Sequence, residues 1–220
     1  MAFDTSIIKE GARVHDRLAL ISLDHKRLAA VGSAAMFGRS QASALHPANA
    51  AGIFAYHDGV EALRAEFLGR DGWRKYAKGG LEGIYHDEHR LIILFKNVHR
   101  CCSDAETPQA APVGVNSEKI CENATLFDHV GVDLPSVGYI LDPGSFGVKT
   151  SRISVFYLMI DQDGRLELSM PVFKEKAIEY CVERIYIVED ADLDRLDDLA
   201  EDAAQDDDDF VIEVKRKNEM

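Results

Sequence analysis

A four-residue segment brings together side chains that are able to bind a metal ion or to transfer protons. His86, Asp87, Glu88 and His89 supply two imidazoles and two carboxylates at consecutive positions, and both groups are ligands of Zn²⁺ and Mn²⁺ in proteins. The histidines are three positions apart in a predicted turn, whereas the metalloprotease helix motif places them four apart on one face. Polar residues are also typical of hairpin tips. The segment therefore indicates either a metal-dependent hydrolase or nuclease, or an ordinary turn.

A second group of potential ligands lies in a stretch with little periodicity, from about residue 99 to 151. It contains His99, Cys101 and Cys121, with Cys102 and His129 nearby. Structural zinc sites use paired cysteines at Cys-x₂₋₄-Cys spacing, which this set lacks. The weak metal candidates are thus His86, His89, His99, Cys101 and Cys121. Thiol redox chemistry and chance clustering remain the alternatives, and no cofactor is strongly implied.

The C-terminal segment carries most of the net charge of the chain. Residues 189–220 include 14 acidic and 4 basic side chains, a net charge of −10 out of −13 for the whole chain. Four consecutive aspartates, Asp206 to Asp209, precede an apolar segment in which Phe210 and Ile212 alternate with other residues. Blocks of like charge stay solvated and usually serve as interaction tails or as solubility aids. We expect Asp206, Asp207, Asp208, Asp209, Phe210 and Ile212 to bind a basic protein partner.

Length and composition narrow the class of protein. A chain of 220 residues is long enough for one stable domain with appendages. The acidic balance argues against direct nucleic-acid binding, which requires clustered Lys and Arg. The sequence has neither the basic-then-apolar start of a signal peptide nor an apolar run of about 18 residues. We therefore expect a cytoplasmic protein with no membrane contact and with cysteines present as thiols.

Apolar periodicity predicts helices in the N-terminal third. Val14, Leu18, Ile21, His25 and Leu28 fall on one helical stripe. Residues 32–52 predict a small-residue helix followed by a loop. A further helix is predicted from an Asp58 and Glu61 capping box to Gly69, with Val60, Leu63 and Phe67 as its buried stripe.

From residue 81 the periodicity changes to that of strands. Two hairpins are predicted, one around residues 86–89 and one at Asp161-Gln-Asp-Gly164, whose Asp-Gly pair suits a tight turn. Phe173–Cys181 is compatible with a short helix, and Glu183–Val188 predicts another strand. The fold class is therefore α+β: an N-terminal helical block followed by a mainly antiparallel sheet of about five strands, with an acidic tail.

The sequence predicts one α+β domain over residues 1–188, containing the long irregular loop 99–151, and a flexible tail over 189–220. No phosphate-binding glycine loop and no Gly-x-Ser-x-Gly elbow is present in it. We therefore favour a non-catalytic cytoplasmic binding or regulatory protein. The alternative is a metal-dependent hydrolase or nuclease that uses the His86–His89 segment.

Overall fold

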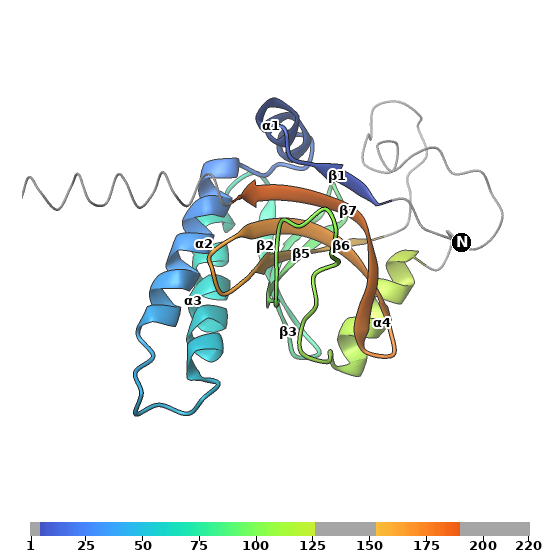
Figure 1. Cartoon of the computed structure of the whole chain (residues 1–220). Coiled ribbons are helices and arrows are strands. Elements are labelled where there is room, and N and C mark those ends of the chain that lie inside the picture. Colours follow the sequence, from blue (N-terminus) through green and yellow to red (C-terminus); the bar gives the residue numbers. More distant parts are fainter. Residues whose placement is uncertain (1–4, 126–152, 190–220) are drawn as a thin grey trace, which may run out of the picture. The chain divides into compact units, whose positions relative to one another are not determined.

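A mixed β-sheet of seven strands is the centre of the structure (Figure 1). The computed structural model describes residues 5–125 and 153–189. The strands lie in the order β1-β7-β6-β5-β4-β3-β2. The pairs β1–β7 and β4–β5 are parallel, and the other four pairs are antiparallel. The α+β class is confirmed, and the described sheet has seven strands where about five are predicted.

The strand bounds confirm both predicted hairpins and correct one segment. The seven strands are β1 (Ser6–Ile8), β2 (Trp73–Lys78), β3 (Leu81–His86), β4 (Leu91–Asn97), β5 (Ser154–Ile160), β6 (Leu166–Lys174) and β7 (Ala177–Val188). The predicted helix over Phe173–Cys181 is wrong, because β6 and β7 form a hairpin there. Its turn holds Glu175 and Lys176 at φ of 52° and 67°, a conformation usually supplied by Gly or Asn.

The helices also correct two predicted boundaries. They are α1 (Gly11–Ala19), α2 (His25–Ser40), α3 (Ala50–Phe67) and α4 (Val115–Thr125). The first apolar stripe is divided between α1 and α2, because Ser22 adopts a φ of 55° and the Asp24 side chain caps α2 by accepting from the Arg27 amide. Asp58 lies inside α3 and does not begin it. Gly69, with a φ of 75°, follows the end of that helix as predicted. None of the described helices combines the length and apolar character needed to cross a membrane.

The α2–α3 hairpin packs closely on one face of the sheet because glycines stand at the contacts. A side chain at Gly59 of α3 would overlap the Phe95 ring of β4, and one at Gly38 of α2 would overlap the Asp58 carboxylate of α3. A Cβ at Gly32 of α2 would lie 3.0 Å from the Leu166 side chain of β6. These contacts fix both helices on the same sheet face, side by side (Figure 1).

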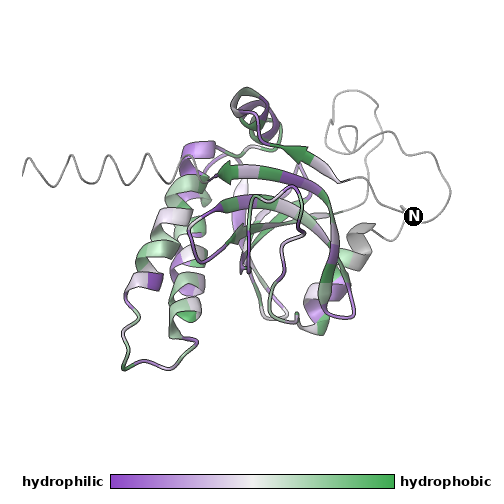
Figure 2. Cartoon of the chain, viewed as in Figure 1, coloured by the Kyte–Doolittle hydropathy of each residue, from purple (hydrophilic) through white to green (hydrophobic). Residues whose placement is uncertain are grey.

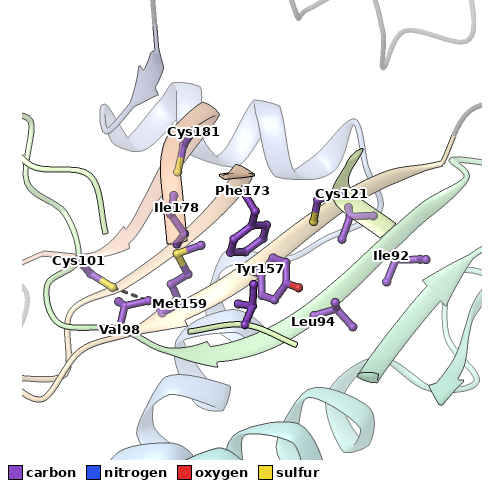
Figure 3. Close-up of a cluster of buried hydrophobic side chains, with 12 residues drawn as sticks. Ile92, Leu94, Val98, Cys101, Cys121, Tyr157, Met159, Phe173, Ile178 and Cys181 are labelled. Atoms are coloured by element: carbon purple, nitrogen blue, oxygen red, sulfur yellow. Dashed lines mark hydrogen bonds between the residues drawn. The ribbon is translucent and has the colours of Figure 1, made fainter. Parts of the chain in front are cut away.

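The opposite sheet face carries a second core, covered by α4 and by residues 98–113 (Figure 3). Alternate residues of β4 and β5 point into it, since successive side chains of a strand point to opposite faces. The buried members include Ile92, Leu94, Val155, Tyr157 and Met159 from the strands, and Val98, Cys101, Val113 and Cys121 from the covering segments.

A buried ion pair anchors the covering segment to the sheet. Arg184 of β7 donates from Nε and Nη2 to the Glu167 carboxylate of β6 at 3.0 and 2.7 Å. Glu167 also accepts from the Ser169 hydroxyl at 2.7 Å and from the Cys102 amide at 2.6 Å. Arg184 Nη1 donates to the carbonyl oxygens of Ser103 and Glu106. Every part of the pair that faces the covering segment is therefore bonded to its backbone.

Asp161, which is fully buried, holds the neighbouring position of the same segment. Its carboxylate accepts from the Cys101 amide at 2.9 Å and from Arg165 Nε at 2.6 Å. It also accepts from the amides of Asp163 and Arg165, which closes the predicted β5–β6 turn. The consecutive amides of Cys101 and Cys102 are thus each bound by a buried carboxylate.

Breaking the Glu167–Arg184 pair should strongly destabilise the fold. Replacing Arg184→Met leaves the Glu167 carboxylate buried without its cation, which should lower the free energy of unfolding by about 3–5 kcal/mol in urea titrations. The double variant Glu167→Gln/Arg184→Met should lose less, since neither member of the pair is then left as an unpaired buried charge. Lys174→Met breaks the exposed pair with Glu179 and should cost less than about 1 kcal/mol. An equal loss in Arg184→Met and Lys174→Met would contradict the anchoring role.

Candidate functional site

The structure brings His86 and His89 together at the β3–β4 turn. Their ring centroids are 4.3 Å apart. His86 Nδ1 accepts from the His89 amide at 3.2 Å, so the proton of the neutral ring is on Nε2, which donates to the Asp71 carbonyl at 2.5 Å. His89 Nε2 lies 2.9 Å from the Ser22 hydroxyl. Both ring nitrogens of His86 are therefore occupied by backbone groups.

These bonds tie the turn before β2 to the β3–β4 hairpin. The Trp73 ring contacts the buried His86 ring edge-on at 5.1 Å between centroids. Gly72 has a φ of 85°, and a side chain there would meet His86 Nε2 at 3.0 Å. Asp87 forms an exposed ion pair with Arg74 at 2.9 Å. In residues 5–125 and 153–189, no group of three His, Cys, Asp or Glu side chains is arranged to hold a metal ion.

The remaining metal candidates do not gather around this turn. His99 is exposed, and its amide donates to the Gln109 carbonyl at 2.7 Å. Cys101 and Cys121 belong to the segments that cover the second core, and their side chains are buried in it (Figure 3). The Cys101 thiol donates to the Met159 carbonyl at 3.3 Å, and the Cys102 thiol lies 3.4 Å from the Leu166 and Val188 carbonyls.

Burial keeps these thiols protonated. All four cysteines are free thiols, as predicted. Burial, followed by the Glu167 carboxylate, raises the pKa of the thiols of Cys101, Cys102 and Cys181, the last to about 12. Thiolates are the nucleophiles and the metal ligands of cysteine chemistry, so the arrangement disfavours both roles at neutral pH.

An open groove lies between α3 and β3, and we call it the α3–β3 groove. Its volume is about 630 Å³, and it is lined by Tyr56, His57, Val60, Glu61, Arg64, Ala65, Leu68 and Glu82. Seven of these residues belong to α3 or directly follow it, at the spacing of one helix face. The volume is within the range of about 300–1,000 Å³ typical of small-ligand sites.

Two charged groups of the α3–β3 groove, Arg64 and Glu82, are bonded to each other, and Arg64 is also bonded to the sheet. Arg64 forms an ion pair with Glu82 and donates to the backbone carbonyls of Tyr76 at 2.9 Å and of Gly83 at 3.3 Å. Burial raises the pKa of the Tyr56 phenol, helped by Glu82 and opposed by Arg64. The phenol therefore stays neutral at neutral pH. A neutral phenol beside both apolar and charged side chains suits binding of a ligand with an apolar body and a polar group.

Sequence reasoning did not find this groove. Arg64 and Glu82 come from a helix and a strand that the fold brings together, and nothing in their local sequence links them. The repeat of Tyr56, Val60 and Arg64 at four-residue spacing is the one available signal, and it is shared by any helix with a partly buried face.

The predicted partner-binding residues Asp206, Asp207, Asp208, Asp209, Phe210 and Ile212 lie outside the described residues.

Comparison with known proteins found no relative of the chain. No family model, no curated protein and no solved structure matches it.

The buried thiols should be unreactive in the native protein. We expect Ellman's reagent at about pH 8 to label less than about one thiol per native chain within minutes, and all four after unfolding in urea. Ala105→Cys places a thiol on the exposed part of the covering segment and should add one fast-reacting group. Rapid labelling of the unmodified native chain would show that the segment opens.

Acidification should destabilise the fold through His89. Burial, and then the neighbouring His86 ring, lowers the pKa of His89 from its usual 6.5. The unfolded state therefore binds more protons as pH falls through this range, so the free energy of unfolding should decrease between about pH 7.5 and about pH 5.5. His89→Gln should flatten this decrease in urea titrations. His57→Gln removes an exposed histidine and should leave it unchanged; equal slopes in the two variants would contradict the assignment.

Proposed function

We propose that the chain is a non-catalytic binding or regulatory protein that engages a basic protein partner, partly through its acidic C-terminal segment. The observation that carries this proposal is the distribution of charge. Residues 189–220 hold −10 of the net charge of −13. A segment with this excess of carboxylates attracts a cationic surface over a distance of about one Debye length, ~10 Å at 0.1 M salt.

The described domain supports the assignment of partner binding to the C-terminal segment, because the buried carboxylates of the domain are paired with arginines. Each of the three fully or nearly fully buried acids has an arginine partner: Glu183 with Arg17 at 2.7 Å, Asp161 with Arg165 at 2.6 Å, and Glu167 with Arg184 at 2.7 Å. These acids serve the fold. The excess of acidic over basic side chains is concentrated in the C-terminal segment, since residues 1–188 hold 24 acidic and 21 basic side chains.

The apolar residues that follow the aspartates would hold the partner after the charged residues have attracted it. Phe210 and Ile212 alternate along the sequence, and alternation places both on one face if the segment pairs with a sheet edge of the partner. Charge would then accelerate encounter, and apolar contacts would slow dissociation. The α3–β3 groove supports a binding role for the domain as well, since its lining combines the apolar side chains of Val60, Ala65 and Leu68 with the Arg64–Glu82 ion pair.

The proposal predicts that the two parts of the segment act on different rate constants. A peptide of alternating lysine and valine serves as the probe, immobilised for surface plasmon resonance over a salt series. Replacing Asp206–Asp209 with asparagine should slow association at low salt by about tenfold and reduce the salt dependence. Replacing Phe210 and Ile212 with serine should mainly speed dissociation.

A matched control removes the same charge elsewhere. Glu10, Asp16, Glu88 and Glu106 are exposed acids of the domain, and changing all four to their amides should alter association far less than the aspartate replacement. Equal effects of the two fourfold variants would show that the segment acts only through its contribution to the net charge of the chain. Binding that ignores salt and both segment variants would contradict the proposal.

A further inference from the structure

The accessible charge of the α3–β3 groove is negative. Its lining contains two carboxylates, those of Glu61 and Glu82, and one guanidinium, that of Arg64. Glu61 is exposed, and the side chain of Glu82 is 39% exposed, whereas that of Arg64 is 20% exposed. A ligand that enters the groove therefore meets the carboxylates more readily than the guanidinium.

The Arg64 guanidinium neutralises only one of the two carboxylates. It bonds to Glu82 Oε2 and to two backbone carbonyls of the sheet, which leaves Glu82 Oε1 without a hydrogen bond to a described residue. Within the described part of the chain, Glu61 forms neither an ion pair nor a hydrogen bond. The groove therefore has carboxylate oxygens that are free to accept hydrogen bonds from a ligand.

The Tyr56 ring gives the groove an aromatic surface beside these charges. It contacts the Phe95 ring of β4 at 6.4 Å between centroids, which holds it against the sheet. Besides burial, Glu82 raises the pKa of the Tyr56 phenol and Arg64 lowers it, so both charged groups lie near the ring. The face of an aromatic ring attracts a cation, and the phenol therefore adds to the preference set by the carboxylates.

One face of α3 supplies both the apolar and the charged parts of the lining. Val60, Arg64 and Leu68 follow one another at four-residue spacing, and Glu61 and Ala65 do so beside them. The colours of α3 in Figure 2 accordingly alternate between apolar and polar along the helix. Because these side chains are carried by one regular helix, their arrangement is largely formed before a ligand binds.

We infer that the α3–β3 groove binds a small organic cation, an amine attached to an aromatic or other apolar body. The ammonium group binds the carboxylates of Glu61 and Glu82, and the apolar body packs on Tyr56 and on the apolar side chains of the lining. The volume of about 630 Å³ suits a small molecule. This inference goes beyond the proposed function, because the site and its ligand are independent of the C-terminal segment and of its protein partner.

The other classes of small ligand fit the groove less well. An anion would meet two carboxylates and a guanidinium that is already bonded to Glu82 and to the sheet. A metal ion would lack ligands, since no group of three His, Cys, Asp or Glu side chains in residues 5–125 and 153–189 is arranged to hold one. A wholly apolar ligand would leave the Glu61 and Glu82 carboxylates partly desolvated without a partner.

The test compares three indole ligands that share one apolar body and differ in charge. Tryptamine carries an ammonium group, tryptophol a neutral hydroxyl, and indole-3-acetate a carboxylate. Calorimetric or NMR titration of the full chain should give tryptamine a dissociation constant of about 1 mM or lower. Tryptophol should bind at least about tenfold more weakly, because it lacks the charge-assisted hydrogen bonds, and indole-3-acetate more weakly still.

Two matched pairs of variants locate the bound ligand. Glu61→Gln should weaken tryptamine binding about tenfold and leave tryptophol binding unchanged. Glu66→Gln makes the same change on the same helix but outside the lining, and it should weaken neither. Ala65→Trp should block the groove to both ligands, whereas Ala30→Trp, at an exposed position of α2, should not.

Two controls keep the test decisive. Circular dichroism melting should show that each variant is folded, and the exposed Glu61→Gln carries the test if Ala65→Trp does not fold. Replacing Asp206–Asp209 with asparagine should leave the tryptamine dissociation constant within about twofold, since charges beyond a Debye length are screened. This last variant separates the groove from the proposed function of the C-terminal segment.

Several results would overturn the inference. Equal affinity for tryptamine and tryptophol, tighter binding of indole-3-acetate, no tryptamine binding at about 10 mM, or equal effects of Glu61→Gln and Glu66→Gln would each do so. Loss of tryptamine binding in the Asp206–Asp209 variant would move the cation to the C-terminal segment. Binding of the lysine–valine peptide that is lost in Glu61→Gln and Ala65→Trp would assign the groove to a protein partner.

Discussion

The Glu167–Arg184 ion pair is the interaction on which the covering of the second core depends. It lies within β6 and β7, and it also bonds the backbone of residues 102, 103 and 106, so that an irregular segment can cover an apolar core. An irregular segment brings backbone amides and carbonyls that need partners when they are buried. One charged side chain can form hydrogen bonds with several of these amides and carbonyls at once, whereas an apolar side chain can form none. The same requirement explains why Asp161 is fully buried beside Cys101.

His86, Cys101 and Cys102, whose side chains could bind a metal ion or act as nucleophiles, form hydrogen bonds that stabilise the fold. Both nitrogens of His86 bond backbone groups, and the thiols of Cys101 and Cys102 donate to carbonyl oxygens in a low-dielectric core. In the function that we propose, attraction of a partner by the acidic C-terminal segment extends over about one Debye length and is screened by salt.

The sequence by itself determined the parts of the fold that local rules govern. The Asp161–Gly164 turn and the end of α3 at Gly69 follow from residues that tolerate positive φ or close a turn with a side chain. Where the apolar periodicity is strong, the sequence also predicts whether a segment is a helix or a strand. The charge of the C-terminal segment and the near absence of charge between residues 28 and 57 are fixed by composition alone.

Tertiary structure decided what local rules cannot express. Glu175 and Lys176 adopt left-handed conformations that their types disfavour, because the turn is held from outside: the Lys176 carbonyl accepts from the Val113 amide at 3.0 Å. The polar segment Trp73–Lys78 forms strand β2 because it pairs with β3. Its sequence has no alternation of apolar and polar residues that would predict a strand. The α3–β3 groove and the bonding of His86 likewise depend on residues far apart in the sequence. Sequence patterns report the neighbours of a residue along the chain, whereas the protonation and exposure of a side chain depend on its neighbours in space.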